Sequence, residues 1–464
     1  MKNKSLVILG SGPGGYVAAI RAAQMGLSVI VVEREGLGGV CLQHGCIPMK
    51  ALLRSVDILQ SARDASSFGV ICSNVGFDFS RMMKRKNDIV AINEKGIESL
   101  FKANNIKLIR GTGRLLSPLQ LEITDNHGSK NRIDADYVII ATGSSSLVPP
   151  FITLDQTCIL GCEGALALNS LPSNMVILGG GILGCEFASL FNTLDVNVTI
   201  IEKLQTLIPT WDRDLAKRVT ASFRKRSIDV RVQTAVKRVK TDNSAGSVKV
   251  TLSTGETIIT DSCVVALGRK PNIENIGLEE SGIALWNERY RGIQVNDHLQ
   301  TNIPTVYAVG DVTGIRPLAH VASAQGIAAV EHIFGMDSVV RYDAVPDCFW
   351  AQPELGSVGI TEQDAKKQGL DVGISRFSYR SMGIAHVLGE TDGFVKVITE
   401  KGTGKVLGIH ICGHSAPEMV AEASVIVTNG LTVEDVKNTI HAHPTMGEIL
   451  KEGVLSVKDL NIHG

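Results

Sequence analysis

Two stretches of the chain repeat one pattern of apolar and polar positions. In the first, apolar runs over residues 5–9 and 27–33 flank a glycine-rich turn and a segment of helical periodicity over residues 16–25. Short apolar runs bounded by turns predict buried strands, and the amphipathic segment between them predicts a helix. The chain therefore begins with a predicted strand–helix–strand unit.

The second stretch has the same order of elements much further along the chain. Apolar runs over residues 175–178 and 196–202 flank a glycine turn and a helical segment over residues 183–194. In both units an acidic residue, Glu33 or Glu202, ends the second strand at the same distance from the first glycine of the turn. Two such units predict two dinucleotide-binding sites.

The other segments predict elements that surround these two units. Residues 55–108 have mainly helical periodicity, residues 115–133 predict short strands, and residues 228–259 predict a strand meander. From about Arg341 onwards, strand-like stretches alternate with amphipathic helices. The pattern predicts an α/β fold with two Rossmann-like dinucleotide-binding domains and a C-terminal α+β domain.

Composition narrows the class of protein. The 464 residues are 44% hydrophobic and 20% charged, a balance that is ordinary for a folded chain of several domains. The formal net charge of −1, with no long run of one sign, argues against a nucleic-acid binder. No stretch approaches the roughly 18 apolar residues of a membrane helix, and the first apolar run is too short for a signal peptide. We therefore expect a cytoplasmic protein without a membrane partner.

The first glycine turn has the chemistry of a pyrophosphate site. Gly10 permits the tight turn, Gly12 lets the backbone approach a phosphate, and Gly15 lets helix and strand pack closely. The helix that follows would direct its N-terminal N–H groups at the phosphates, and Glu33 could accept hydrogen bonds from ribose hydroxyls.

The second turn repeats this arrangement with Gly179, Gly181 and Gly184. Glu202 suits the free 2′-hydroxyl of NAD and would repel the 2′-phosphate of NADP. Lys203 follows directly and weakens this preference slightly. The second site is therefore expected to take NAD.

The chain has nine cysteines, and among them Cys41 and Cys46 form a pair that is flanked by turn-forming residues. Pro48 follows Cys46 near the predicted start of a helix, and a helix N-terminus lowers the pKa of a thiol. A loop of this length can close into a disulfide that opens and reforms. Most of the other cysteines lie in apolar runs, so they are interpreted as buried free thiols.

The segment 38–50, which contains this pair, resembles the redox-active disulfide of the class I flavoprotein disulfide reductases, the pyridine nucleotide-disulfide oxidoreductases. Segments 141–143, 268–272 and 308–311 match further motifs of that family in order, so the resemblance spans essentially the whole chain. The resemblance implies FAD at the first glycine turn and NAD at the second.

The resemblance also assigns residues to the two cofactors. The implied FAD residues are Gly10, Gly12, Gly15, Glu33, Gly39, Lys50, Ala141, Thr142, Gly143 and Asp311, and the implied NAD residues are Gly179, Gly181, Gly184, Glu202 and Gly268. Asp311 would bind the ribityl chain of the flavin, and Lys50, paired with Glu186, would lie near its reactive nitrogen.

Near the C-terminus, His443 precedes a Pro-Thr dipeptide and Glu448 follows shortly after. A dithiol oxidase needs a base, and a carboxylate can orient an imidazole and raise its basicity. The resemblance assigns the base to His443 and the orienting carboxylate to Glu448, while His441 is expected to be structural. In the family this base reaches the disulfide of the other subunit, so a homodimer is implied.

The implied reaction links the two cysteines to both cofactors. His443 takes a proton from a dithiol substrate, the substrate thiolate attacks Cys41, and Cys46 becomes the thiolate that passes the electron pair to FAD and on to NAD⁺. Since Glu202 disfavours NADP and the tail from 450 to 464 lacks cysteine, the sequence favours the dihydrolipoamide dehydrogenase branch, whose members work with lipoyl-bearing acyltransferase subunits of 2-oxo acid dehydrogenase complexes.

Several alternatives remain at this point. They are a glutathione- or mercuric-reductase-like enzyme, a mainly structural subunit of a large complex, and a cysteine-based redox sensor. Inside the redox segment, His44 could tune the thiolate or simply be exposed, and Met49 stands where a small or polar residue is expected. The expected domains are 1–145 for FAD, 146–268 for NAD, 269–341 for the second part of the FAD domain, and 342–464 for the dimer interface.

Overall fold

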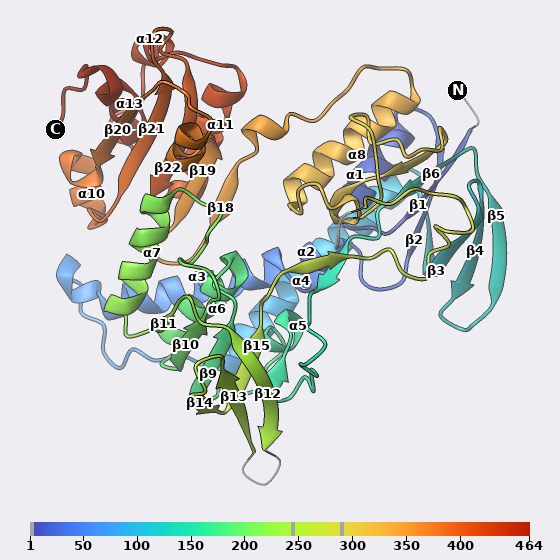
Figure 1. Cartoon of the computed structure of the whole chain (residues 1–464), viewed down its shortest axis with the longest axis horizontal. Coiled ribbons are helices and arrows are strands. Elements are labelled where there is room, and N and C mark those ends of the chain that lie inside the picture. Colours follow the sequence, from blue (N-terminus) through green and yellow to red (C-terminus); the bar gives the residue numbers. More distant parts are fainter. Residues whose placement is uncertain (1–3, 243–245, 288–291) are drawn as a thin grey trace.

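The computed structural model describes residues 4–242, 246–287 and 292–464. Three groups of strands organise this part of the chain, and Figure 1 shows them at the right, at the bottom and at the upper left of the view. Among the described helices, none has the length and apolar character needed to cross a bilayer.

The first sheet has seven strands in the order β17-β6-β1-β2-β3-β4-β5. The strands from β17 to β3 pair in parallel, and β4 and β5 extend the sheet antiparallel. The strands are β1 (Ser5–Leu9), β2 (Ser28–Glu33), β3 (Lys107–Ser117), β4 (Gln120–Asp125), β5 (Lys130–Asp134), β6 (Tyr137–Ile140) and β17 (Val306–Ala308). Because β17 joins β6 after the second group of strands, the chain leaves this sheet and returns to complete it.

Five helices accompany this sheet: α1 (Pro13–Gln24), α2 (Gly39–Gln43), α3 (Cys46–Arg63), α4 (Phe79–Ala103) and α8 (Ala319–Ile333). Helices α1 and α8 pack closely, since a Cβ on Gly326 would lie only 2.5 Å from the carbonyl oxygen of Gly14. Helix α3 extends from the first sheet towards the other two parts of the molecule (Figure 1).

The second sheet is parallel, with the order β11-β10-β9-β15-β8. Its strands are β8 (Ile159–Leu160), β9 (Asn174–Leu178), β10 (Asn197–Ile201), β11 (Asp229–Arg231) and β15 (Ser262–Val265). Beside it lie an antiparallel sheet of β12 (Val236–Asp242), β13 (Ser247–Leu252) and β14 (Thr257–Thr260), and the helices α5 (Cys162–Ala165), α6 (Ile182–Thr193) and α7 (Arg213–Lys225). A small pairing of β7 (Ser144–Ser146) with β16 (Arg269–Pro271) joins the two connections between the sheets.

The third sheet is antiparallel, with the order β18-β19-β22-β21-β20. Its strands are β18 (Asp347–Phe349), β19 (Leu355–Gly359), β20 (Val372–Ser378), β21 (Phe394–Glu400) and β22 (Val406–Cys412). Its helices are α9 (Glu362–Lys367), α10 (Gly383–Leu388), α11 (Ala416–Thr428), α12 (Val433–Asn438) and α13 (Gly447–Leu455). Apolar side chains of α11 and α13 cover this sheet and form a core of their own.

The structure confirms the predicted α/β class and both strand–helix–strand units. The element boundaries differ by a few residues: α1 begins at Pro13 rather than near residue 16, because proline is well suited to the first helical position. Strand β10 ends at Ile201, so that Glu202 lies just beyond the strand rather than within it.

Candidate active site

Cys41 and Cys46 lie at the junction of two helices. Cys41 is in the short helix α2, and Cys46 is the first residue of α3, with Gly45 as the N-cap. Both are free thiols, and their side chains lie close enough for each to shift the pKa of the other. The close pairing fits a disulfide that can form and open.

The two thiols differ in acidity. The hydrogen bond from Cys41 and the nearby Lys50 ammonium lower the pKa of Cys46 to about 7, against the opposing effects of burial and Glu186. The same hydrogen bond, together with burial, raises the pKa of Cys41 far above its ordinary value. The position of Cys46 at the start of α3 also makes it the more acidic thiol, because a helix N-terminus stabilises a thiolate. The reduced pair therefore carries its negative charge on Cys46 near neutral pH.

Lys50 and Glu186 form the ion pair that the sequence predicted. The Lys50 ammonium lies 2.7 and 2.9 Å from the two carboxylate oxygens of Glu186, whose side chain is fully buried in α6. The backbone N–H of Trp350 also donates to this carboxylate, at 3.3 Å. Since Lys50 follows Cys46 by one helical turn, the ion pair fixes the positive charge beside the thiolate.

Two glycine backbones meet at the first turn and leave a shallow cradle. Gly39 has a φ of +60°, and a Cβ there would lie 2.7 Å from the Cα of Gly12. A Cβ on Gly15 would lie 2.0 Å from the carbonyl oxygen of Gly10, so helix α1 can sit on the turn only with glycine there. Gly12 caps α1 without a side-chain hydrogen bond, which leaves the first-turn N–H groups to an anion. These features fit the pyrophosphate of FAD.

The second turn has the same construction. Gly179 has a φ of +105°, and a Cβ on Gly184 would lie 2.0 Å from the Gly179 carbonyl oxygen. A Cβ on Gly181 or on Gly268 would meet no atom within 4 Å, so open space lies beside both residues. Helix α6 begins after Gly181 without a side-chain cap. The residues therefore fit a second dinucleotide.

The acidic residue that ends β2 and the one that directly follows β10 hold their turns in the same way. Glu33 accepts hydrogen bonds from the backbone N–H of Ser11 at 2.8 Å and of Glu35 at 2.9 Å. Glu202 accepts from Gly180 and Leu204, both at 2.7 Å. Each carboxylate is thus fixed at the edge of its glycine turn, where the remaining lone pairs can accept from a ribose.

A further polar cluster joins the three family motif segments 141–143, 268–272 and 308–311. Asp311, in the short helix after β17, accepts a hydrogen bond from the Ser144 hydroxyl and lies 3.7 Å from Arg269. The Arg269 guanidinium donates to Ser144 at 2.6 Å, and Thr142 donates to the carbonyl oxygen of Asn272 at 2.8 Å. Ala141 and Gly143 flank these contacts in the connection after β6.

Sequence reasoning did not single out Ser144 and Arg269 as site residues. Both stand inside or beside motif segments that it identified, next to Gly143 and Gly268 respectively. Their position in those motifs was the available signal. Their mutual contacts depend on the pairing of β7 with β16, which no local pattern shows.

Two unusual residues of the redox segment have structural explanations. Met49 is fully buried and packs in the apolar core that includes residues of α3 and α6. His44 is 40% exposed and lies 3.9 Å from the carboxylate of Glu35. The structure favours the exposed alternative for His44.

His443 and Glu448 lie together in the third part of the molecule. His443 Nδ1 is 3.0 Å from a carboxylate oxygen of Glu448, whose other oxygen accepts from the backbone of Thr445. Although partial burial opposes it, these two hydrogen bonds lower the pKa of Glu448 and keep it ionised. The His443 side chain is 79% exposed, and no contact joins it to Cys41 or Cys46 within the described part of one chain.

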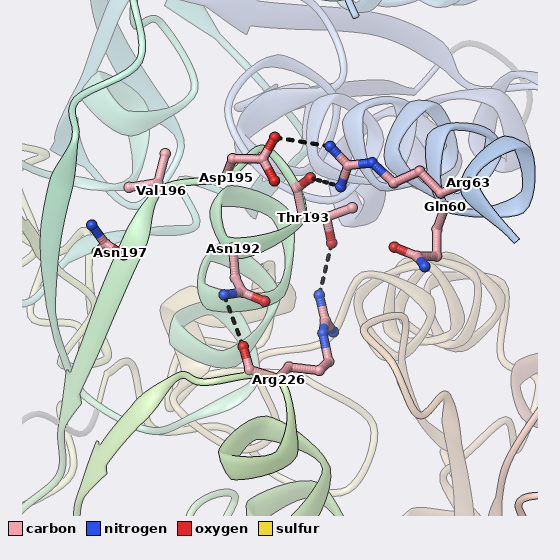
Figure 2. A pocket seen from close by; sticks show the side chains of 8 residues that line it. All are labelled: Gln60, Arg63, Asn192, Thr193, Asp195, Val196, Asn197 and Arg226. Atoms are coloured by element: carbon pink, nitrogen blue, oxygen red, sulfur yellow. Dashed lines mark hydrogen bonds and ion pairs between the residues drawn. The ribbon is translucent and has the colours of Figure 1, made fainter. Parts of the chain in front are cut away.

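A surface pocket of about 430 Å³ lies elsewhere, and none of the predicted site residues lines it. Figure 2 shows that Arg63 and Arg226 reach the C-terminal end of α6 from two sides. Arg63 donates to the carbonyl oxygen of Thr193 at 2.9 Å, and Arg226 donates to the hydroxyl of Thr193 at 2.7 Å. Because α6 has no basic residue in its last turn, these guanidinium groups supply the charge that stabilises its end.

Comparisons with known proteins agree with this geometry. A family model described as pyridine nucleotide-disulphide oxidoreductase matches residues 4–326, and the dimerisation domain of the same family matches residues 345–454. A dihydrolipoyl dehydrogenase of Bacillus subtilis is 39% identical, with 99% of this chain and 98% of the relative covered. A mitochondrial dihydrolipoyl dehydrogenase of Dictyostelium discoideum is 36% identical, with 100% and 96% covered. The crystal structure of LpdA from Mycobacterium tuberculosis has a TM-score of 0.92 at 27% identity, with 98% of this chain and 99% of that chain covered.

Proposed function

Because the chain belongs to the pyridine nucleotide-disulphide oxidoreductase family, we propose that it oxidises protein-bound dihydrolipoamide to lipoamide and reduces NAD⁺ to NADH. Dihydrolipoyl dehydrogenases are among the relatives that match it over nearly its full length, and the cofactors of the proposed reaction are FAD and NAD. The observation that carries the proposal is the Cys41–Cys46 pair, with its acidic thiol at the start of α3 beside the Lys50–Glu186 ion pair.

The cysteine pair carries out the thiol chemistry. A thiolate of the substrate attacks the Cys41 sulfur of the disulfide, a mixed disulfide forms, and Cys46 leaves as a thiolate. The second substrate thiol then attacks the mixed disulfide, which releases the cyclic lipoamide disulfide and leaves both cysteines reduced. The low pKa of Cys46 makes it the better leaving group.

When bound, FAD would supply an acceptor for the electron pair of the dithiol, and NAD⁺ would supply the final acceptor for a hydride. The backbones of Gly10, Gly12 and Gly39 would hold the FAD pyrophosphate, with Asp311 held for the ribityl chain by Ser144 and Arg269. The second turn, with Glu202, would hold NAD. Lys50 would keep the electrostatic environment of the thiolate and flavin positive.

The substrate must lose a proton before it can attack. His443 of the partner subunit is proposed as the base, since the family forms homodimers through the domain that includes residues 345–454. Its exposure in one chain and its hydrogen bond to Glu448 support this role, because a base that serves another subunit must face outwards.

We also propose the division into an FAD domain (1–145 and 269–341), an NAD domain (146–268) and an interface domain (342–464). The return of β17 to the first sheet supports the two-part FAD domain. Limited proteolysis tests it: cleavage is expected near residues 145, 268 and 341, and protected sites there would contradict these boundaries.

Lipoyl-bearing acyltransferase subunits of 2-oxo acid dehydrogenase complexes are the proposed protein partners. The names of the relatives support this proposal through the substrate that they share. A cytoplasmic location is proposed because the odd number of cysteines in the sequence does not suggest a framework of structural disulfides. Co-purification and cell fractionation test the two proposals.

A comparison of substrates tests the proposed activity. The FAD-loaded chain should form NADH from dihydrolipoamide and NAD⁺ and should be far slower with glutathione disulfide and NADPH. The Cys41→Ser variant should lose the dihydrolipoamide reaction and keep its flavin, because the cradle is made of backbone. Faster reduction of glutathione disulfide than oxidation of dihydrolipoamide would contradict the assignment.

A further inference from the structure

A second histidine is buried beside the proposed base. His441 stands two residues before His443, yet its side chain is only 8% exposed, whereas that of His443 is 79% exposed. Its Nε2 atom lies 2.6 Å from a carboxylate oxygen of Glu422, which belongs to α11. The distance is that of a strong, charge-assisted hydrogen bond.

The His441–Glu422 contact occurs in a segment that no regular secondary structure holds in place. Residues 439–446, between α12 and α13, form no regular helix or strand. Lys451 of α13 donates to the carbonyl oxygen of Thr439 at 2.7 Å, Thr445 donates to Ala442 at 2.7 Å, and Glu448 binds His443. All of these contacts lie within the segment or reach it from the helix that follows.

The His441–Glu422 contact differs from them because it reaches a separate element. Helix α11 packs on the third sheet and contributes Val420, Ala423 and Ile426 to its core. Glu422 is therefore carried by a packed helix. Its hydrogen bond fixes the segment to that helix at His441, two residues before the base His443.

The position of the base has a large effect on its efficiency. Proton transfer requires heavy atoms within about 2.6–3.2 Å, and a displacement of about 1 Å can cost on the order of 100-fold in rate. We propose that His441 and Glu422 are positioning residues, which hold the 439–446 segment so that His443 meets the substrate thiol at the site of the other subunit. This inference rests on the proposed function and gives a role to a histidine expected to be structural.

The test compares His441→Ala and Glu422→Ala with a matched control, Glu434→Ala, which removes an exposed acid of α12 that pairs with Lys437. Both test variants should lower kcat for dihydrolipoamide by about 10- to 100-fold and change KM by less than about twofold, since orientation and not binding is lost. The double variant should be no slower than the slower single variant. His441→Gln, which can still donate to Glu422, should recover part of the rate.

Two further readouts separate positioning from general damage. Electron transfer from NADH to ferricyanide needs no base for a dithiol, so it should be unchanged in every variant. Amide hydrogen exchange, followed by mass spectrometry, should quicken in residues 439–446 of both test variants and stay unchanged in the control.

Unchanged kcat in both test variants, or an equal loss of the ferricyanide reaction, would overturn the inference. If the unmodified enzyme does not oxidise dihydrolipoamide, the proposed function is wrong, and the exchange measurement still decides on the contact. Unchanged exchange in residues 439–446 would then show that His441 and Glu422 do not hold the segment.

Discussion

At the scale of single residues, the site depends on placing one negative and one positive charge close together. Cys46 at the start of α3 and Lys50 one turn later come from the same helix, so the spacing in the sequence sets their proximity. Glu186 comes from another part of the chain, and its fully buried carboxylate forms an ion pair with Lys50. Removing one partner of such a buried pair leaves an uncompensated charge, which is costly.

The acidity of Cys46 should depend on Lys50. Its thiolate prevails above pH 7 and is lost as the pH falls through the pKa of about 7. Because Lys50 lowers that pKa, Lys50→Met should move the midpoint upwards. The measurement is the rate of iodoacetamide alkylation of Cys46 against pH in the reduced enzyme, followed at the level of the peptide.

Lys95→Met is the control for this experiment, since Lys95 is exposed on α4 and is not among the charges that act on Cys46. An unchanged midpoint in Lys50→Met would show that the hydrogen bond from Cys41 alone sets the acidity.

Some residue roles could be predicted from the sequence, and others could not. Gly10, Gly15, Gly179 and Gly184 were predictable because their backbone angles or close contacts allow no side chain, so the requirement is local. Met49 was unexpected because it fills a core shared by α3 and α6, segments far apart in sequence. The contact of Glu422 with His441 could not be predicted from the sequence either, because it joins two separate segments.

At the scale of elements, the repeated strand–turn–helix units position both cofactors. In each unit the helix begins directly after the turn and lies against the strand, and this requires glycine at the point of closest approach. The sequence predicted these units well because their apolar periods are regular. The helix starts differed by one to three residues, and Pro13 at the first position of α1 was a signal for the earlier start.

Gly15→Ala should damage the first unit. The added Cβ would lie 2.0 Å from the Gly10 carbonyl oxygen, so α1 must move away from the turn. We expect a loss of about 1–3 kcal/mol in stability, as is usual for overpacking, together with a lower content of bound FAD.

Gly96→Ala is the matched control within a helix. Gly96 is exposed in α4, and a Cβ there meets no atom within 4 Å, so the change should stabilise the protein by about 0.5–1 kcal/mol. Denaturation midpoints and the flavin absorbance of the purified variants measure both effects. Full FAD content in Gly15→Ala would contradict the packing argument.

At the scale of the whole molecule, a buried ion cluster joins the second and third parts. Lys396 of β21 is 2% exposed, and its ammonium lies 2.9 Å from Asp212, 2.7 Å from Asp214 and 2.6 Å from Glu362. Asp212 is the N-cap of α7, so the cluster holds that helix against the third sheet. Although burial opposes it, the three carboxylates raise the pKa of Lys396.

Lys396→Met should leave Asp212 buried without its cation and cost about 3–5 kcal/mol. The exposed pair of Lys401 with Asp371 provides the control, because Lys401→Met should cost at most about 1 kcal/mol. Urea denaturation of the two variants compares them. Equal midpoints would show that the cluster contributes nothing to the contact between the two parts.

The stability of this contact should also depend on pH. The ion pairs lower the pKa of Asp214, against the opposing effect of burial. A carboxyl group with a lowered pKa contributes stability above its unfolded pKa and loses it as the pH falls through the folded one. The protein should therefore weaken in acid, and the Lys396→Met variant should show less of this dependence in thermal melts across the acid range.

The whole-molecule plan could be predicted only in outline. The change of character near residue 341 indicated a third α+β part, and the structure has its antiparallel sheet there. The ion cluster joins residues that no periodic pattern relates, and the position of His443 relative to the cysteines of another subunit was implied by the family alone. Contacts between distant segments are what the sequence pattern cannot show.

The most direct test of the proposed activity is the anaerobic reaction of the FAD-loaded enzyme with dihydrolipoamide before NAD⁺ is added. We predict a long-wavelength absorbance band from the Cys46 thiolate beside the flavin, its absence in Cys41→Ser, and the formation of NADH when NAD⁺ follows. If the flavin spectrum does not change with dihydrolipoamide, or if Cys41→Ser responds as the unmodified enzyme does, the cysteine pair is not the entry point for electrons and the proposed function is wrong.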